Sequence, residues 1–189
     1  MFLELEVVSS FFATKYYINN GEDLVYKGVN SWGWLFSNTL IHNSSLNTLA
    51  SVNKKWSIYK PTYIIKHGNS TSILQIKSSW KGYYKCSNNT DVYQLISHKG
   101  LKTSIFLNDI QIGYYEQNEL EWLETRKYQI HLNPDADQPL ICSIIISLDN
   151  YKNGKDADRG TTFYVGKLTP EIKPFDESWR PKNKNDNKV

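Results

Sequence analysis

The stretch PLICSIIISLDN, residues 139–150, limits the possible folds of this chain more than any other feature of the sequence. It contains four isoleucines, two leucines and a cysteine, and it has no charged side chain before Asp149. A membrane-spanning helix needs about 20 consecutive, mainly apolar residues, so this stretch is too short to be a membrane span. It is therefore expected to lie buried in a folded domain, either as a strand or as a helix.

Local preferences around this stretch point in both directions. Isoleucine is branched at Cβ, which favours a strand. The flanking residues favour a helix, because Asp135 and Asp137 can accept hydrogen bonds from a first helical turn and Pro139 suits the first helical position. Lys152 and Gly154 are typical of a helix end.

A helix from 138 to 150 would have almost no polar face. Only Ser143 and Ser147, spaced by four residues, interrupt its apolar surface. A helix that is apolar all round has to be buried all round. Something must then surround it, and a sheet closed into a barrel is the arrangement that the rest of the chain can supply.

The rest of the chain consists mostly of short β-type runs separated by turn residues, at spacings of roughly 8 to 12 residues, which is typical of a sandwich or a barrel. The first run begins at once, with Leu5 and Val7 alternating with Glu4 and Glu6. The sequence therefore predicts a mainly β fold, a closed antiparallel β-barrel of about 10–12 strands around one buried hydrophobic helix at about 138–150.

One hairpin is predicted in more detail. The pair Asn108-Asp109 is expected to form its turn. Strict alternation after the turn then predicts that Ile110, Ile112 and Tyr114 face the same side of the sheet.

Two segments are expected, a barrel domain at 1–150 and a C-terminal extension at 151–189. Within the extension, residues 161–168 (TTFYVGKL) could add one more strand, and the last eight residues are expected to be disordered. The region around Ile172, Phe175 and Trp179 has two interpretations. It is either a strap over the barrel or a docking segment for a protein partner.

Composition excludes some classes of protein. The chain has 189 residues and a net charge of +3, but residues 1–150 carry equal numbers of basic and acidic side chains, which argues against nucleic-acid binding. The N-terminus lacks the pattern of a signal peptide, and the two cysteines are predicted to be free thiols, so we expect a cytoplasmic protein. The abundance of Asn, Lys, Ile and Tyr is typical of an AT-rich, bacterial genome.

The pattern of strands followed by an apolar helix resembles a known family. The segment from ILQIKSSW through SIFLNDIQIGYYEQ and RKYQIHLN to PLICSIIISLDN is similar to the second half of a LURP-one-related domain. These domains belong with tubby proteins and phospholipid scramblases to the tubby C-terminal-like superfamily. The resemblance implies a β-barrel around a central hydrophobic helix over roughly residues 10–150. The present chain departs from the family in continuing for nearly forty residues beyond the helix, and no lipid-contacting residue of tubby proteins can be aligned with it.

No catalytic motif is present. His42, His67, His98 and His131 are scattered and have no metal-ligand spacing with either cysteine, and there is no phosphate-binding loop or nucleophile elbow. We therefore expect neither an enzyme nor a bound cofactor or metal.

The candidate ligand-binding residues are Lys77, Trp80, Lys81 and Lys85, which lie close together around a predicted turn. Lysines beside an interfacial aromatic residue suit an anionic membrane surface. The alternative is that these lysines protect exposed strands from aggregation. The leading interpretation is a non-catalytic binding module for anionic phospholipid headgroups or a membrane surface. Such a module would act as a peripheral membrane protein. The second is a soluble protein-interaction or scaffold domain.

Trp32 and Trp34 are a further candidate pair, since they would share one face of a strand. They could form an aromatic platform for a sugar or a peptide, or they could pack into the protein.

Overall fold

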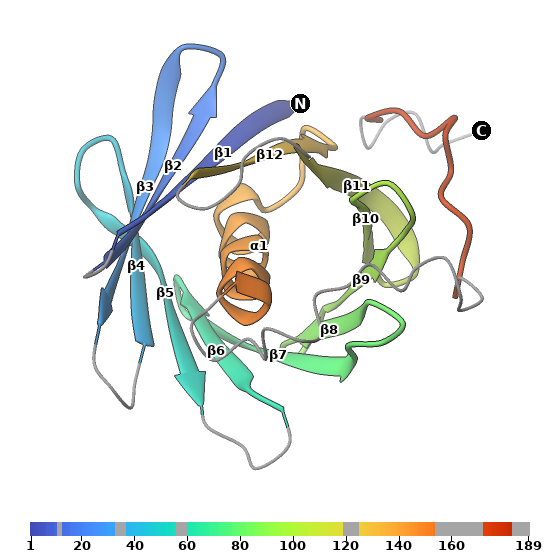
Figure 1. Ribbon diagram of the computed structural model, residues 1–189, viewed down its shortest axis with the longest axis horizontal. Coiled ribbons are helices and arrows are strands. Elements are labelled where there is room, and N and C mark those ends of the chain that lie inside the picture. Colours follow the sequence, from blue (N-terminus) through green and yellow to red (C-terminus); the bar gives the residue numbers. More distant parts are fainter. Residues whose placement is uncertain (11–12, 33–36, 56–59, 119–124, 154–171, 183–189) are drawn as a thin grey trace.

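The computed structural model describes residues 1–10, 13–32, 37–55, 60–118, 125–153 and 172–182. Within these residues, twelve strands form a closed antiparallel barrel with one helix inside it (Figure 1). The predicted fold class is thus confirmed. The strands are β1 (Phe2–Ser9), β2 (Ala13–Asn20), β3 (Asp23–Trp32), β4 (Ser37–Asn43), β5 (Thr48–Lys55), β6 (Thr62–His67), β7 (Ser70–Ser78), β8 (Tyr83–Ser87), β9 (Val92–Ser97), β10 (Lys102–Leu107), β11 (Ile110–Gln117) and β12 (Thr125–Leu132), and the helix is α1 (Gln138–Asn153).

The barrel has the simplest possible connectivity. Every strand pairs with its neighbours in sequence, and β12 pairs with β1 to close the ring. In that closing pair Leu5 lies opposite Tyr128, and the amino group of Met1 donates a hydrogen bond to the carbonyl oxygen of Leu132 at 2.7 Å. Closure removes the unpaired strand edges that would otherwise template aggregation.

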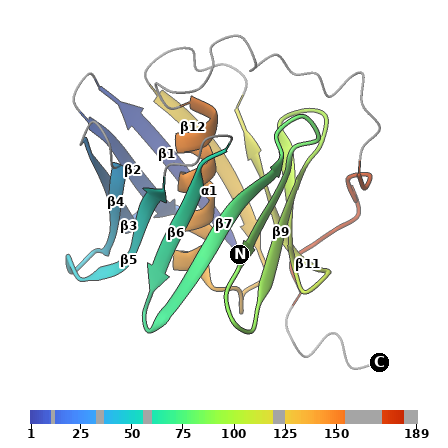
Figure 2. The same ribbon diagram turned by 90° about the horizontal axis from the view of Figure 1, so that it is seen from below.

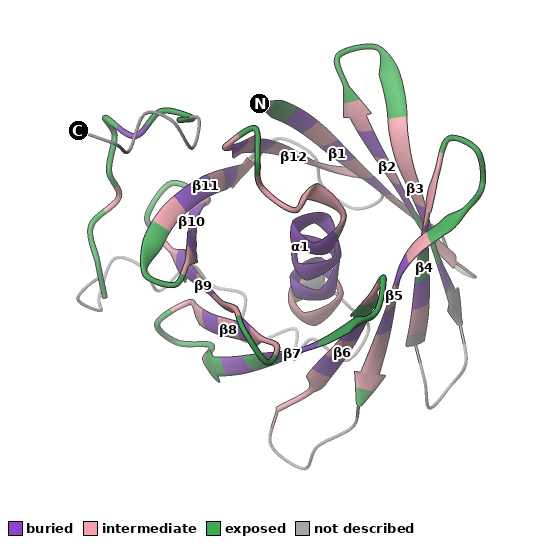
Figure 3. Ribbon diagram, turned by 180° about the vertical axis from the view of Figure 1, so that it is seen from behind, coloured by how far each residue is buried: buried purple, intermediate pink, exposed green. Residues whose placement is uncertain are grey.

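Helix α1 runs along the axis of the barrel, enclosed by the ring of strands (Figures 1 and 2). Each residue from Leu140 to Leu148 is at most 2% exposed, and this part of the helix is buried on every side (Figure 3). Its two serines are satisfied within the helix, because the Ser143 hydroxyl donates to Pro139 O at 2.6 Å and the Ser147 hydroxyl to Ser143 O at 2.7 Å. The predicted central helix is confirmed, and it extends three residues beyond 150.

The start of the helix follows the predicted capping chemistry. The Asp137 carboxylate accepts a hydrogen bond from the Leu140 backbone N–H at 3.1 Å, and the Asp137 carbonyl accepts one from Ile141 at 3.0 Å. Asp137 is therefore the N-cap residue, which satisfies one of the backbone donors that a first turn leaves open.

The core is formed by alternate residues of the strands packed against the helix. Along β1, Leu3, Leu5 and Val7 are fully buried, while the residues between them are only partly buried. This is the pattern of a strand with one face towards an apolar interior. Two tyrosines, Tyr16 and Tyr63, are among the largest fully buried side chains.

The alternation predicted for the hairpin of β10 and β11 is wrong in one respect. The turn at Asn108-Asp109 is present, with both residues at positive φ. The register, however, shifts between Ile105 and Phe106 and leaves Ile112 as an extra residue of β11. Ile112 is buried in the core, whereas Tyr114 lies outside the core and contacts Phe175 and Trp179. A β-bulge of this kind changes which face the following residues occupy.

Both cysteines are free, as predicted, and both are buried. Burial raises the pKa of the Cys86 and Cys142 thiols to about 12. The folded protein is therefore expected to resist a thiol-reactive disulfide reagent at pH 8 and to react at both sites once unfolded, since only the thiolate reacts. A Ser79→Cys variant, with its thiol on an exposed turn, should react in the folded state.

These thiols also predict how stability depends on pH. The folded state holds Cys86 and Cys142 protonated up to about pH 12, whereas the unfolded thiols ionise near their ordinary pKa of 9.0. Their contribution is fully present below pH 9 and is lost as the pH rises towards 12. Fast labelling of either native thiol at pH 8 would contradict this description of the core.

The remaining predictions concern membrane-spanning helices and the C-terminal extension. In the part of the chain that the structure describes, no helix has the length and apolar character needed to cross a membrane. The possible strand at 161–168 and the last seven residues, 183–189, lie outside the described residues. Residues 172–182 lie beside the outer face of the barrel and have no regular secondary structure (Figure 1).

Candidate functional site: the basic end of the barrel

The two ends of the barrel differ in charge. Because consecutive strands are antiparallel, their connections alternate between the ends. One end has the β2–β3, β4–β5, β6–β7, β8–β9 and β10–β11 turns and the entry to α1, and we name it the acidic end. These connections contain no Lys or Arg, and their acidic residues are Glu22, Asp91, Asp109, Asp135 and Asp137. Asp23 is the first residue of β3, and Lys66 lies one residue before this end of β6.

The opposite end, named the basic end here, carries lysines on its described strand ends and turns and on the last turn of α1. They are Lys55, Lys60, Lys77, Lys81, Lys99, Lys102 and Lys152. In the sequence, the stretch between β11 and β12 adds Glu119, Glu121 and Glu124, which lie outside the described residues. The excess of positive charge is therefore greatest around β5 to β8.

The hairpin of β7 and β8 brings together the four residues predicted from the sequence. Gln75 pairs with Lys85 and Ile76 with Tyr84, and the register then shifts so that Ser78 pairs with Tyr83. Lys77 is the extra residue of this bulge. Lys77 and Lys81 are exposed and Lys85 is partly exposed. The structure therefore confirms that these lysines share one hairpin, although it does not test whether they bind a ligand.

The turn between the two strands presents Trp80. Its side chain is 58% exposed, which is unusual for so large an apolar group. Gly82 closes the turn at a φ of +58°, and a Cβ there would lie 2.5 Å from the Cβ of Ser97, so only glycine fits. The tight turn leaves Trp80 and Lys81 at the tip of the hairpin.

The lysines of this hairpin have no carboxylate partner in the described part of the chain. None of the ion pairs found there includes Lys77, Lys81 or Lys85. A fourth lysine adds to the group, because the Lys60 ammonium donates a hydrogen bond to the carbonyl oxygen of Lys77 at 3.1 Å. The arrangement suits an external anion or anionic surface, since positive charge and an exposed indole lie on one small projection.

A buried ion pair lies inside the barrel, close to its basic end. Arg126 of β12 and Asp149 of α1 form a bidentate pair, with Nε to Oδ1 at 2.8 Å and Nη2 to Oδ2 at 2.9 Å. Asp149 is 3% exposed and also accepts a hydrogen bond from the Tyr128 hydroxyl at 2.6 Å. Arg126 Nη2 reaches Ser9 Oγ at 3.2 Å. The network joins the end of α1 to β1 and β12.

The pKa values of the groups around this pair follow from their burial. Burial, together with the neighbouring Asp149 carboxylate, raises the pKa of the Tyr128 hydroxyl well above its ordinary value. The pKa of Arg126 is also raised, because the hydrogen bonds and charge of Asp149 outweigh the cost of burying the guanidinium. At neutral pH Arg126 is therefore charged and Tyr128 is a hydrogen-bond donor.

A second polar contact fixes the neighbouring side of the helix. The Tyr16 hydroxyl of β2 donates to Asn150 Oδ1 at 2.7 Å, and Asn30 Nδ2 of β3 lies 3.5 Å from the same oxygen. The last turn of α1 is therefore held from two sides. Lys152 then lies over the ring of Tyr84, 5.5 Å from its centroid, where a positive charge complements the helix dipole.

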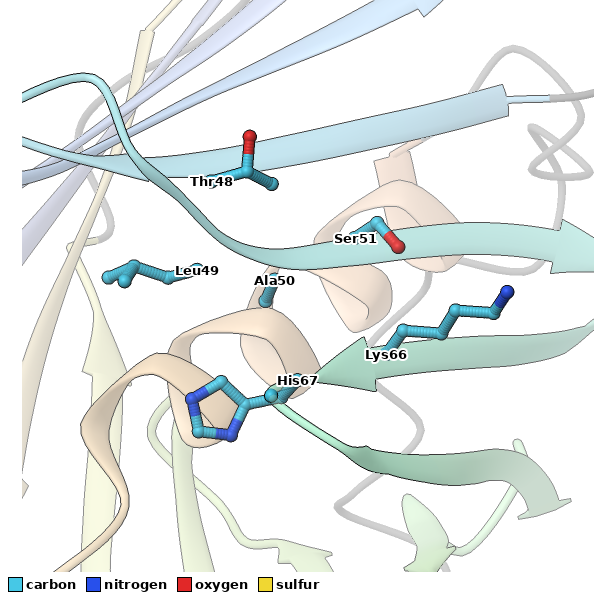
Figure 4. A pocket seen from close by; sticks show the side chains of 7 residues that line it. Thr48, Leu49, Ala50, Ser51, Lys66 and His67 are labelled. Atoms are coloured by element: carbon cyan, nitrogen blue, oxygen red, sulfur yellow. The ribbon is translucent and has the colours of Figure 1, made fainter.

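A separate hollow of about 370 Å³ opens near the acidic end, between β5 and β6 (Figure 4). It is lined by residues that include Ser51, Lys66 and His67. The His67 ring lies 3.3 Å from the Asp137 carboxylate that caps α1. The hollow is on the side of the barrel and does not join the lysine hairpin.

The four histidines come from different strands and turns of the barrel. Among the described residues, no three His, Cys, Asp or Glu side chains are grouped so as to hold a metal ion. His42 contacts the Thr48 hydroxyl, and His131 stacks on Tyr114. Trp32 is the last residue of β3, and Trp34 lies outside the described residues, so their proposed platform stays a prediction.

Sequence reasoning missed the Arg126–Asp149 pair. One signal was available, since Asp149 is a charged residue at the end of a wholly buried apolar run and a buried carboxylate requires a partner. The identity of the partner was not available, because Arg126 is 23 positions earlier in a different element.

Comparison with known proteins gives no relative. No family model matches the chain, and neither the curated proteins nor the solved structures searched contain a match.

Proposed function

We propose that this protein is a non-catalytic binding module that attaches to an anionic phospholipid surface through its basic end. The observation that carries the proposal is the β7–β8 hairpin, which presents Lys77, Lys81 and Lys85 beside the exposed ring of Trp80. Each lysine near an anionic surface contributes about 1 kcal/mol, and an indole can enter the headgroup region with its apolar body. In this proposal the protein is cytoplasmic and peripheral to the membrane.

The charge of the whole molecule supports this orientation. The described turns of the basic end carry lysines and those of the acidic end carry carboxylates, so a negative surface attracts the basic end and repels the acidic end. The exposed indole of Trp80 adds an aromatic ring to the basic end. The turns at the acidic end contain no aromatic residue.

The family resemblance is consistent with the proposal but does not carry it. Membership of the tubby C-terminal-like superfamily stays a prediction, because no comparison tests it. A shared barrel is weak support for a shared ligand, since one fold hosts many functions. The proposal therefore depends on the hairpin and on the charge of the two ends.

The test is co-sedimentation with vesicles of phosphatidylcholine, with and without phosphatidylserine. Replacing Lys77, Lys81 and Lys85 together by glutamine is expected to weaken binding to the anionic vesicles by roughly two decades, at about 1 kcal/mol for each lysine. Thermal stability should change little, because exposed charges contribute little to folding. Binding of the unmodified protein should fall as salt is raised, since the surface attraction is screened.

A matched control separates this hairpin from net charge. Replacing Lys27, Lys66 and Lys182 by glutamine removes the same charge from β3, β6 and the C-terminal segment. This control should keep most of the vesicle binding. An equal loss in both triple variants would mean that only net charge matters, and absence of binding by the unmodified protein would remove the lipid proposal. The soluble interaction domain would then be the better description.

A further inference from the structure

The outer face of β9–β12 carries a second apolar cluster, separate from the barrel core. Three large buried side chains, Ile96, Phe106 and Trp179, do not belong to the core around α1. Ile96 and Phe106 come from the strands, whereas Trp179 comes from the C-terminal segment 172–182. The segment lies along this side of the barrel (Figure 1). The segment therefore adds a buried aromatic side chain to a side of the barrel where the strands bury two apolar side chains outside the core.

Two aromatic side chains of the segment form most of the contact. Phe175 packs edge-on against His98 and Tyr114, each at a ring separation of 5.3 Å. Trp179 packs against the same Tyr114 at 5.7 Å and is only 7% exposed. Tyr114 in turn stacks on His131 at 4.5 Å. Tyr114 is thus the shared contact of both anchors.

Polar contacts fix where the segment lies along the strands. Trp179 Nε1 donates to the carbonyl oxygen of Gln111 at 3.3 Å, and the Lys182 backbone N–H donates to Asn133 Oδ1 at 2.8 Å. Lys102 pairs with Glu177 at 3.2 Å. Glu177 lies between Phe175 and Trp179 in the sequence, and Lys182 follows them. The polar contacts therefore define one register and one direction of the segment along the strands.

The segment also forms a turn that its own hydrogen bonds stabilise. The Asp176 carboxylate accepts hydrogen bonds from the backbone N–H and the hydroxyl of Ser178, and the Trp179 N–H donates to the Asp176 carbonyl. The hydrogen bonds from Ser178 lower the pKa of Asp176. This turn bends the chain between Phe175 and Trp179 and allows both rings to reach Tyr114. A short segment that forms its own turn and binds through two aromatic anchors has the character of a linear peptide ligand.

We propose that the outer face of β9–β12 is a recognition surface for a linear peptide of another protein, and that residues 172–182 occupy it in cis as a built-in competitor. The partner peptide carries two aromatic residues four positions apart, with an acidic residue between them to meet Lys102. The proposal is independent of lipid binding, since this face is on the side of the barrel rather than on the β7–β8 hairpin.

Tethering explains how the segment controls the surface. A ligand on the same chain acts at an effective concentration of about 1 mM. If the segment itself binds the open surface with a dissociation constant of about 100 μM, a free peptide binds the protein about tenfold more weakly than it binds the open surface. A partner must therefore bind more tightly than the segment does, or the segment must first be released.

The experiment uses the full chain and a labelled peptide of residues 172–182, IKPFDESWRPK. The variant Phe175→Ala/Trp179→Ala removes both anchors from the competitor and leaves the strands unchanged. We expect this variant to bind the labelled peptide at least tenfold more tightly than the unmodified protein does, by fluorescence anisotropy. Adding Tyr114→Ala, or replacing the peptide's Phe and Trp by Ala, should remove the binding.

A second measurement applies if the double variant does not fold. In the unmodified, ¹⁵N-labelled protein, millimolar unlabelled peptide should shift the indole N–H resonance of Trp179, because the peptide displaces it from Gln111. Equal peptide binding by protein and variant, no binding by the variant, or an unmoved Trp179 resonance at saturating peptide would each overturn the proposal. A concentration-dependent dimer that Phe175→Ala/Trp179→Ala abolishes would also overturn it, since the surface would then serve exchange between two copies of this chain.

Discussion

Replacing Ile145 by aspartate is expected to prevent the protein from folding. Ile145 is 1% exposed and lies near the middle of α1, the helix that the ring of strands encloses (Figure 3). A carboxylate there would lose its hydration and find no cation, and the substitution would also remove apolar contacts. The expected result is insoluble protein, or a soluble chain with no cooperative thermal transition, as measured by circular dichroism and gel filtration.

The matched control is the same substitution at an exposed position. Ile110 is 64% exposed at the start of β11, so Ile110→Asp should fold and melt nearly as the unmodified protein does. Ile145→Val should also fold, at a cost of about 1 kcal/mol for one methyl group. A soluble Ile145→Asp protein with a sharp melting transition would contradict the position of α1 inside the barrel.

Replacing Asp149 by asparagine should produce the second largest loss. The change keeps the shape of the side chain but leaves the Arg126 guanidinium, which is only 14% exposed, without its carboxylate. Breaking a buried pair from one side costs about 3–5 kcal/mol, because the remaining charge is not compensated. The loss should appear as a lower midpoint of urea unfolding with an unchanged slope.

Two controls establish that burial causes this loss. Glu177→Gln breaks an exposed pair, since Glu177 is 77% exposed, and should cost less than about 1 kcal/mol. The double variant Arg126→Leu/Asp149→Leu removes both charges and should be less destabilised than Asp149→Asn, because no lone charge remains. A cost for Asp149→Asn no larger than that for Glu177→Gln would show that the pair does not hold the helix end.

Much of the fold could be predicted because it depends on local composition. A helix with an apolar surface on all sides can only be stable if it is enclosed, and the short alternating strands are the only material that can enclose it. The N-cap at Asp137 and the turn at Asn108-Asp109 follow from the same kind of local chemistry.

It was harder to predict which face of the sheet each side chain occupies. A bulge adds one residue to one strand, and every later side chain then changes face. The shift beside Ile105 explains why Ile112 is part of the core and Tyr114 is not, and the shift beside Ile76 places Lys77 within a bulge. Neither bulge has a local signature in the sequence, because each depends on how two strands meet.

The lysine hairpin was predictable, but its surroundings were not. Lys77, Lys81 and Lys85 are close in sequence around one tight turn, so their proximity follows from the turn itself. The surrounding charge depends on topology, since Lys60 and Lys152 come from other elements that end at the same place. The aromatic cluster at Tyr114 also depends on a segment about sixty residues further along the chain.

By itself, the sequence determined the elements of this protein, namely short strands, their tight turns and one helix that must be enclosed. Periodicity, capping residues and turn residues act over a few positions, so the sequence can be read directly for them. Only the tertiary structure decided that twelve strands close into a ring, that Arg126 meets Asp149, and that the described turns carry lysines at one end and carboxylates at the other. These features join residues that are distant in the chain, and their positions are fixed by strand register and barrel closure rather than by local preference.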